Sequence, residues 1–290
     1  MMRKKPMLAY PVSAKPINYE DKIFMQPKLD GVRCVIQYEI PSGFNYAEKD
    51  CGKVVAYSRT GKPWLNIEHI LFNLNPWFIL NPDVILDGEL YNHDLRDDFN
   101  KIISLVRKSK PTDQDRLEAA ELTQFHCYDI IDETKTFEER KTFVTQVVPR
   151  NHCIHHVSTL YCASDYDAKE MHKVNLACGF EGSILRTNDT YACKRTHNLR
   201  KFKDFHDTEA TLTGWVEGKG KRIGTIGKFL AVDSEGNEFG MPVMDKFKKL
   251  QDNFEQMKSW VGKEATFTYF ERTKANSYRH PLFKALRNYE

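Results

Sequence analysis

Short strand-like runs recur through the first 204 positions, and they set the strongest limit on the fold. Each run is rich in Val, Ile, Leu and aromatic residues and is bounded by turn residues, which is typical of β-strands. The runs read "FMQPKLDGVRCVIQYEI", "VVAYSR", "VILDGELY", "FHCYDII", "EGSILR" and "LRKFKDF". Two other segments have helical features. Apolar residues follow helical spacing at Phe99, Ile102, Ile103 and Val106. The segment 163–179 begins with Ser and Asp and ends at Gly179. Together these features predict an α+β fold.

The pattern changes after "KFKDFHD". The segments "TEATLTGWVEG", "IGKFLAVDSEGNEFGM" and "EATFTYFER" resemble strands joined by glycine turns, and "DKFKKLQDNFEQMKSWVG" predicts one amphipathic helix. Several strands with one helix in a short region favour a small β-barrel of the OB type. A sandwich or an SH3-like barrel is also compatible. We therefore expect one domain over 1–204 and a second over 205–290.

Composition excludes several classes of protein. The chain has 290 residues, 41% hydrophobic and 29% charged, as in ordinary soluble domains. Its apolar runs, such as "WFIL", are too short to span a bilayer. The basic N-terminus soon meets prolines, so we expect no signal peptide and a cytoplasmic location. Seven cysteines without C-x-x-C spacing predict free thiols and disfavour zinc. The net charge of +3 leaves a nucleic-acid partner open.

Lys28 stands in the stretch "MQPKLDGVR", between apolar runs that predict a buried sheet. Burying an unpaired lysine is unfavourable. One interpretation is that Lys28 reaches the surface or pairs with Asp30. The other is a covalent nucleophile, because a deprotonated amine can attack phosphorus or a carbonyl. Deprotonating a free lysine at pH 7 costs about 4.6 kcal/mol. A lysine nucleophile therefore needs nearby cations or a metal, and further bases to hold phosphate oxygens.

Later clusters supply such groups. They contain Arg59 and Lys62, Asp87 and Glu89, Glu181 and Arg186, and Lys201 and Lys203. The i, i+2 spacing of the last pair places both ammonium groups on one face of a strand. Each cluster alone is also typical of a turn or a solvated sheet edge. The order and spacing of the four clusters, taken together, indicate that they form a common site.

In this order the clusters resemble the motifs of covalent lysine nucleotidyltransferases, specifically ATP-dependent DNA ligases of the minimal two-domain phage or viral type. The matching segments are "KLDGVR", "SRTGK", "LDGEL", "FHCYDII", "EGSILR", "LRKFKDF" and "RHPLFKALR", between about residues 20 and 287. The resemblance implies a nucleotidyltransferase domain (an ATP-grasp-like DNA ligase domain) with antiparallel sheets, followed by a C-terminal OB-fold β-barrel. It also implies sealing of 3'-OH/5'-phosphate nicks through a lysyl-AMP and a DNA-adenylate.

The resemblance assigns roles to individual residues. Lys28 would take AMP from ATP. Glu89 would hold the ribose, Tyr128 would stack on adenine, and Gln26 would read the adenine amino group. Mg²⁺ or Mn²⁺ would be held by Asp30, Glu181 and Glu89. The remaining ATP contacts would be Arg33, Lys201, Lys203, Arg279 and Arg287. Of these, Lys201 and Lys203 would grip the α-phosphate, and the last two would orient pyrophosphate. Asp30, Lys201 and Lys203 count with Lys28 as catalytic candidates.

The implied partner is nicked double-stranded DNA, held mainly through its backbone because a ligase must act on any sequence. The candidate DNA contacts are Arg33, Ser58, Arg59, Lys62, Arg195, Lys219, Lys221 and Arg222. A solvated hairpin tip is the alternative interpretation of 218–228. The resemblance predicts a monomer without a membrane partner, in the host cytoplasm if phage-encoded. Two features depart from the family: "CKRTH" around Arg195, and an ending, "RNYE", without the usual Asp-Lys pair.

Three other classes of protein are alternatives to a DNA ligase. An mRNA guanylyltransferase shares the lysine chemistry but uses GTP, and "SRTGK" with the "RHPLF" ending favours a DNA ligase. RNA ligases usually carry Glu in place of Asp30. A non-catalytic OB-fold nucleic-acid-binding protein would not need Lys28, Glu89 and Glu181 together. Incubation with labelled ATP or GTP distinguishes a DNA ligase from a guanylyltransferase by which nucleotide forms a covalent adduct.

Overall fold

The structure is a computed structural model that describes residues 4–40, 52–96, 98–273 and 276–287. The chain divides into two compact units, Met1–Phe202 and Lys203–Glu290. The sequence had placed the division after residue 204. Both units contain helices and mainly antiparallel sheets, so the predicted α+β class is confirmed.

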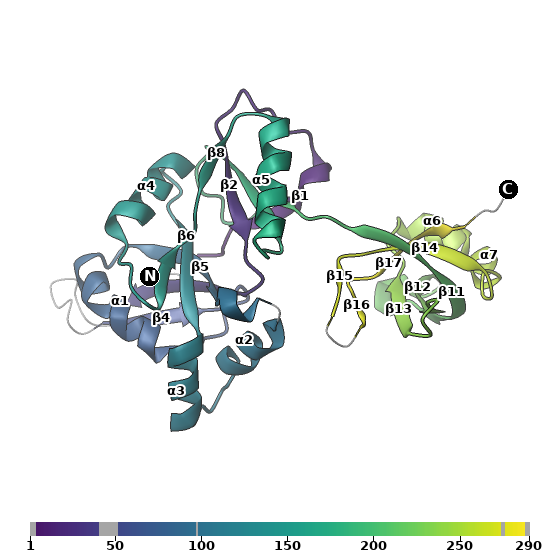
Figure 1. Ribbon diagram of the computed structural model, residues 1–290, viewed down its shortest axis with the longest axis horizontal. Coiled ribbons are helices and arrows are strands. Elements are labelled where there is room, and N and C mark those ends of the chain that lie inside the picture. Colours follow the sequence, from purple (N-terminus) through teal and green to yellow (C-terminus); the bar gives the residue numbers. More distant parts are fainter. Residues whose placement is uncertain (1–3, 41–51, 97, 274–275, 288–290) are drawn as a thin grey trace. The chain divides into compact units, whose positions relative to one another are not determined.

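The first unit is built on two five-stranded sheets (Figure 1). The first sheet has the order β1-β10-β9-β2-β8, with β1 (Leu8–Pro11), β2 (Ile23–Lys28), β8 (Leu160–Cys162), β9 (Gly182–Thr187) and β10 (Arg195–Phe202). The second has the order β4-β3-β5-β6-β7, with β3 (Val32–Glu39), β4 (Lys53–Tyr57), β5 (Ile85–Tyr91), β6 (Gln124–Ile130) and β7 (Ile154–His156). The β1–β10 and β6–β7 ladders are parallel. Each expected run of this unit contains a strand.

The described residues of the first unit form five α-helices: α1 (Glu68–Leu80), α2 (Phe99–Val106), α3 (Asp113–Leu122), α4 (Phe137–Val147) and α5 (Asp165–Ala177). Short 3₁₀ turns lie at Val12–Ala14 and His93–Leu95. Both expected helices, α2 and α5, are present. Ser164 caps α5 by accepting a hydrogen bond from the Asp167 amide at 3.0 Å. Gly179 follows the helix with φ of 83°, a conformation that glycine adopts without strain.

Because successive side chains of a strand point to opposite faces, the second sheet has one apolar face and one face that carries polar groups. Cys34, Ile36 and Tyr38 of β3 belong to the core beneath α1. Val35 belongs instead to a separate cluster with Leu199 of the other sheet. Burying each large apolar side chain in such a core stabilises the fold by about 1.5–3 kcal/mol. The core therefore fixes the sheet while leaving alternate positions of β3, β5 and β6 for polar groups.

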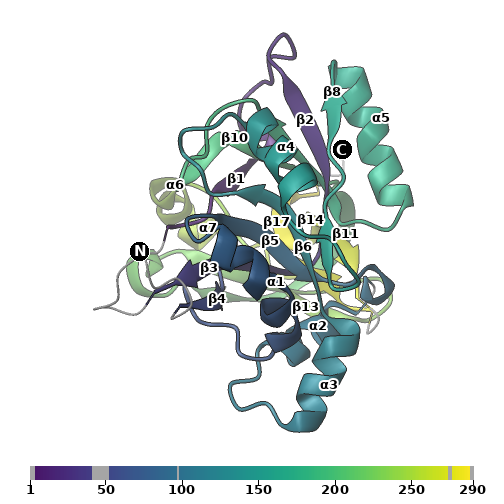
Figure 2. The same cartoon turned by 90° about the vertical axis from the view of Figure 1, so that its left-hand side faces the viewer.

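Helix α5 covers one face of the first sheet. It packs on β2, β8 and β9, and Figure 2 shows it alongside β8 and β2. Met25 of β2 and Leu185 of β9 contribute to the apolar cluster there, with Ala168 of α5. Because successive side chains of a strand alternate between faces, Gln26 and Lys28 lie on the opposite face of β2. This alternation places Lys28 on the side away from α5.

The second unit holds a five-stranded antiparallel sheet in the order β13-β12-β11-β14-β17. Its strands are β11 (His206–Glu217), β12 (Ile226–Val232), β13 (Glu238–Pro242), β14 (Glu264–Tyr269) and β17 (Leu282–Leu286); β15 (Glu271–Arg272) and β16 (Tyr278–Arg279) form a separate ladder, and a 3₁₀ turn spans Gly220–Arg222. Within the described residues no ladder joins β13 to β17, so hydrogen bonding does not close the barrel that the sequence predicted.

The single helix expected near residue 250 is two helices, α6 (Phe247–Asp252) and α7 (Phe254–Lys258). Asn253 lies between them with non-helical dihedral angles, φ −102° and ψ 9°. Asparagine competes with the helix by bonding local backbone groups, and its side chain donates to the Lys249 carbonyl at 2.7 Å. The amphipathic pattern continues across this break, which is why spacing alone predicted one helix.

Composition predicted free thiols and no membrane-spanning segment. The six cysteines among them are all free thiols, and Cys51 lies outside the described residues. Among the helices described, none is long and apolar enough to cross a membrane.

Candidate active site

Lys28, the last residue of β2, forms an ion pair with Glu181, the residue before β9. The Glu181 carboxylate is almost fully buried and the lysine is partly buried. The backbone also joins them, because the Glu181 amide donates to the Lys28 carbonyl at 3.1 Å. The buried lysine therefore has a carboxylate partner 153 positions away in the sequence.

The turn after Lys28 packs closely against β5. A Cβ atom at Gly31 would lie 2.4 Å from the Leu90 carbonyl oxygen and 2.7 Å from Cγ of Glu89. Only glycine fits this close approach, which explains the glycine in "KLDGVR". Glu89 is consequently held near Lys28, and Asp30 lies half-buried in the same turn.

Glu89 is half-buried in β5 and has a raised pKa. Burial raises the pKa of Glu89 to about 7, against the opposing effects of Arg33 and Lys28. Its carboxylate accepts a hydrogen bond from the Tyr128 hydroxyl at 3.3 Å. A carboxyl group that is half-protonated near neutral pH can both donate to and accept from a hydroxyl-rich ligand.

Lys201 of β10 belongs to the same neighbourhood. Burial, together with the charges of Lys28 and Arg195, lowers the pKa of Lys201. The structure therefore brings together four of the five residues expected to share a pocket: Lys28, Glu89, Glu181 and Lys201.

The predicted adenine platform, Tyr128, has two guanidinium groups near its ring. Arg33 is 5.1 Å from the centre of its ring and Arg186 is 5.4 Å away. Arg186 is itself held by Asp129 at 2.7 Å. Asp129 also receives Arg140 of α4 at 2.7 Å. Asp129 and Arg140, which no sequence motif identified, thus support Arg186 beside the ring.

The polar atoms of the Gln26 side chain are bonded to other protein groups and not left open to a base. Its side-chain carbonyl accepts from Nε of Arg186 at 2.7 Å. Its amide donates to the Tyr128 carbonyl at 3.1 Å and to Thr159 at 2.8 Å. The side chain is 3% exposed, so reading an adenine amine with this carbonyl would require displacing Arg186.

Arg33 is also committed within the protein. It forms a two-point ion pair with Asp87 at 2.6 and 2.5 Å, and Asp87 accepts a further bond from Tyr191 at 2.6 Å. Asp87 is fully buried. In this structure Arg33 neutralises Asp87 beside Tyr128, and its assignment to ATP and to a nick phosphate stays a prediction.

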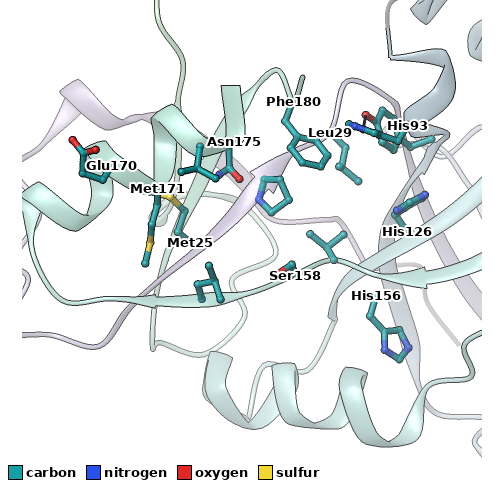
Figure 3. A pocket seen from close by; sticks show the side chains of 15 residues that line it. Met25, Leu29, His93, His126, His156, Ser158, Glu170, Met171, Asn175 and Phe180 are labelled. Atoms are coloured by element: carbon teal, nitrogen blue, oxygen red, sulfur yellow. Dashed lines mark hydrogen bonds between the residues drawn. The ribbon is translucent and has the colours of Figure 1, made fainter. Parts of the chain in front are cut away.

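A separate apolar cavity of about 550 Å³ lies on the other face of β2 (Figure 3). Met25 and Pro27 line it, and α5 contributes Met171 and Asn175. Because Met25 and Pro27 alternate with Gln26 and Lys28, this cavity is not the space around the reactive amine. The ion pair of Lys28 with Glu181, and not this cavity, defines the candidate site.

The turn after β4 contains three predicted DNA contacts. Ser58 organises this turn: its hydroxyl accepts from the Lys62 amide at 3.0 Å, and its amide donates to the Lys62 carbonyl at 2.8 Å. Arg59 and Lys62 are exposed. Arg195, also exposed, donates to the Ala9 carbonyl.

Lys203, Arg279 and Arg287 belong to the second unit. The ammonium of Lys203 lies 4.4 Å, and the guanidinium of Arg279 5.8 Å, from the centre of the buried Phe270 ring. Arg279 also pairs with Glu271. Arg287 pairs with Glu209. Phe270, which no sequence motif identified, therefore gathers two cations from distant parts of the chain.

The basic loop of the second unit is exposed at Lys219 and Lys221. Arg222 is half-buried and donates to the Val243 carbonyl at 3.1 Å. A second basic segment includes α2 and the turn after it, and its lysines Lys101 and Lys108 pair with Glu118 and Asp115 of α3. The loop between β11 and β12 is therefore the more available cationic surface of the two.

A lysine paired with a buried glutamate, flanked by a second lysine and a carboxyl group, defines a site suited to covalent chemistry on a phosphorylated ligand. Comparison with known proteins gives the family. Residues 6–203 match the family model described as "ATP dependent DNA ligase domain". The chain belongs to the ATP-dependent DNA ligase family. No match was found among curated proteins.

Solved structures share the fold over almost the whole chain. A Lig E DNA ligase, from a structure-function study of DNA binding with a minimal scaffold, has a TM-score of 0.74 and 23% identity, covering 99% of this chain and 100% of its own. A structure named Pmar-Lig_PreS3 has a TM-score of 0.74 and 21% identity, covering 98% and 67%. The ATP-dependent DNA ligase of bacteriophage T7, in complex with ATP, has a TM-score of 0.52 and 17% identity, covering 98% of each chain.

Proposed function

We propose that this chain seals nicks in duplex DNA and that Lys28 carries AMP between the two substrates. The observation that supports this most directly is the buried Lys28–Glu181 pair with Lys201 and Glu89 beside it. Membership of the ligase family supports the use of ATP. The assignment of each residue below belongs to the proposal.

In the first step the amine of Lys28 attacks the α-phosphorus of ATP. A nitrogen–phosphorus bond forms as the bond to pyrophosphate breaks, and the amine proton passes to solvent. An ammonium has no free lone pair, so Lys28 must lose a proton before its amine can attack. Lys201 supplies positive charge for the phosphate oxygens, and such positioning and neutralisation account for most catalysis of phosphoryl transfer.

Glu89 and Tyr128 suit the nucleoside. A half-protonated Glu89 can share hydrogen bonds with the two ribose hydroxyls, and the Tyr128 ring offers a flat face to adenine. Arg33 and Arg186 hold the ring in place from within the fold. The base is then recognised by a preorganised surface.

The fit of a magnesium ion rests on carboxylates. In the described part of the chain no group of three or more His, Cys, Asp or Glu side chains could hold a metal alone. Mg²⁺ commonly uses one or two carboxylates with substrate phosphates, and Glu181 and Asp30 fit that requirement. When bound, Mg²⁺ would neutralise charge on the phosphates. Glu89 is the weakest of the three predicted ligands, because a half-protonated carboxyl group binds a cation poorly.

Two steps follow on the DNA. The 5'-phosphate of the nick attacks the lysyl-AMP, forming a pyrophosphate bond to AMP and releasing the Lys28 amine. The 3'-hydroxyl then attacks the 5'-phosphorus, joining the strands and releasing AMP. Arg59, Lys62, Lys219 and Lys221 are exposed cations that would bind phosphates of the backbone.

The test is covalent adenylation. The protein is incubated with labelled ATP or GTP, and the intact mass and the modified residue are determined. We expect AMP on Lys28, no adduct in Lys28→Ala, and a normal adduct in Lys22→Ala, a surface lysine paired with Glu138. Nicked duplex should be sealed only by proteins that form the adduct. An adduct with GTP alone, or sealing by Lys28→Ala, would contradict the proposal.

A further inference from the structure

A buried polar cluster lies behind the reactive strands, on the α5 side of the first sheet. The Nδ1 atom of His172 is 3.0 Å from Oγ of Ser183, and Asn175 donates to the same oxygen at 2.8 Å. His172 is 3% exposed and Ser183 is fully buried. Breaking such a hydrogen bond leaves a buried polar group unsatisfied, so the cluster fixes α5 to β9 firmly.

The same histidine also contacts β10. Its ring stacks on Phe202 with ring centres 3.8 Å apart and an angle of 9° between the planes. Phe202 follows Lys201 directly and ends the first unit. One side chain of α5 therefore touches both β9 and β10.

These contacts coincide with the strand positions that carry the reactive groups. Ser183 is the register partner of Phe202 on β10 and of Pro27 on β2. Lys28 faces Gly182 in the same ladder. Because side chains alternate, Pro27 and Phe202, which face α5, are the immediate neighbours of Lys28 and Lys201. On β9, Gly182 separates Ser183 from Glu181, which precedes the strand.

Close packing at Gly182 leaves little freedom here. Its φ is 148°, and a Cβ atom would lie 2.4 Å from the Phe202 carbonyl oxygen and 3.4 Å from Cε1 of His172. The strands thus meet at a point that His172 supports from behind. A small displacement of either strand would alter the distance between Glu181, Lys201 and Lys28.

We propose that His172 is a positioning residue for the adenylation of Lys28. Its hydrogen bond to Ser183 sets β9 and therefore Glu181, and its stack on Phe202 sets the end of β10 and therefore Lys201. The inference rests on the proposed function, because it concerns the geometry of that reaction. A histidine that merely fills the core would affect stability without affecting the chemical step.

The test separates the two contacts. His172→Phe keeps a flat ring over Phe202 but loses the hydrogen bond. His172→Asn places an amide near the position of Nδ1 but loses the ring. Ser183→Ala removes the hydroxyl, and His172→Ala removes both contacts. Lys169→Ala, a surface change on the same helix, is the control.

Three quantities are measured in the full chain below its Tm: the single-turnover rate of AMP transfer at saturating ATP, KM for ATP, and Tm. We expect His172→Ala to lower the saturated rate about 10-fold or more, since misplacement by about 1 Å can cost 10²-fold. KM should change less than twofold, because the defect lies after binding. The Phe, Asn and Ser183→Ala variants should each lose part of the rate, and Lys169→Ala none.

Two results would overturn the inference. One is a lower Tm with a wild-type saturated rate in the His172 and Ser183 variants that remain folded. The other is an equal loss of rate in Lys169→Ala, which would indicate a general effect on α5. If the wild type forms no adduct on Lys28, both the proposed function and this inference are refuted. The wild-type measurement alone therefore separates a failure of the proposed function from a failure of this inference.

Discussion

The ammonium of Lys28 lies against the carboxylate of Glu181, which is 153 positions later in the chain. Glu181 is almost completely buried, so the pair is held by the fold and not by chance contact at a surface. The glycines beside the pair, Gly31 and Gly182, allow the strands and the turn to approach closely. This pair, with Lys201 and Glu89, forms the centre of the candidate site.

Glu181→Gln tests the carboxylate of this pair. The amide keeps the shape but removes the negative charge, so we expect AMP transfer to Lys28 to slow by about 10²-fold or more, as for other preorganised electrostatic groups. The rate of adduct formation is the measurement. Glu170→Gln, which breaks a surface pair with Lys173, should leave it unchanged. A wild-type rate in Glu181→Gln would remove this residue from the mechanism.

Glu89 makes stability depend on pH. Its folded pKa of about 7 exceeds the ordinary value of 4.5, so the folded state holds the proton more tightly than the unfolded state. Stability from this group is fully present below about pH 4.5 and is lost as pH rises through 7. The shift corresponds to roughly 3 kcal/mol.

Glu89→Gln should remove that dependence. The free energy of unfolding of the variant, relative to wild type, should rise between pH 4.5 and 8, as measured by denaturant unfolding at each pH. Glu255→Gln, at an exposed surface pair, serves as the control. Parallel curves for Glu89→Gln and wild type would show that Glu89 ionises normally.

Arg33→Met distinguishes a structural role from a DNA contact. Removing the guanidinium leaves the buried Asp87 unpaired, which typically costs about 3–5 kcal/mol of stability. We expect this loss in denaturant unfolding, with no change in the salt dependence of nick binding. A slope reduced by about 0.9, the value for one lost phosphate contact, would instead support the DNA role.

Phe270→Leu tests the shared contact of Lys203 and Arg279. Each cation loses an aromatic face worth about 0.5–2 kcal/mol, so the rate of AMP transfer should fall by about 2- to 30-fold if both cations serve the reaction. Phe205→Leu changes an exposed ring that contacts Phe270 by its edge, and it should have a smaller effect. Equal activity of Phe270→Leu and wild type would leave this contact with a structural role only.

The loop between β11 and β12 is tested by its salt dependence. In the double variant Lys219→Ala/Lys221→Ala, the slope of log affinity against log salt for nicked duplex should fall by about 2, since each phosphate contact contributes about 0.9. Lys169→Ala/Lys173→Ala removes two lysines of α5 that pair with acids, and its slope should not change. An unchanged slope in the loop variant would exclude this loop from the DNA interface.

Some structural features followed from local sequence. Helix α5 could be predicted with its ends, because Ser164 and Gly179 act through backbone groups only a few residues away. The helix interrupted at Asn253 could not, because its apolar spacing continues through the break. The strands could be located from their composition, but not their order in two sheets, which depends on pairings between distant segments.

The sequence by itself determined which chemical groups the chain carries and in what order, including Lys28, Glu89, Glu181 and Lys201. Only the tertiary structure decided which partner each buried polar side chain contacts. It placed Arg33 on Asp87, Gln26 on Arg186, and His172 between β9 and β10. The physical reason is that a buried charge or amide must find a partner within the fold. That partner can be any distant residue that the packed sheets bring within hydrogen-bonding distance.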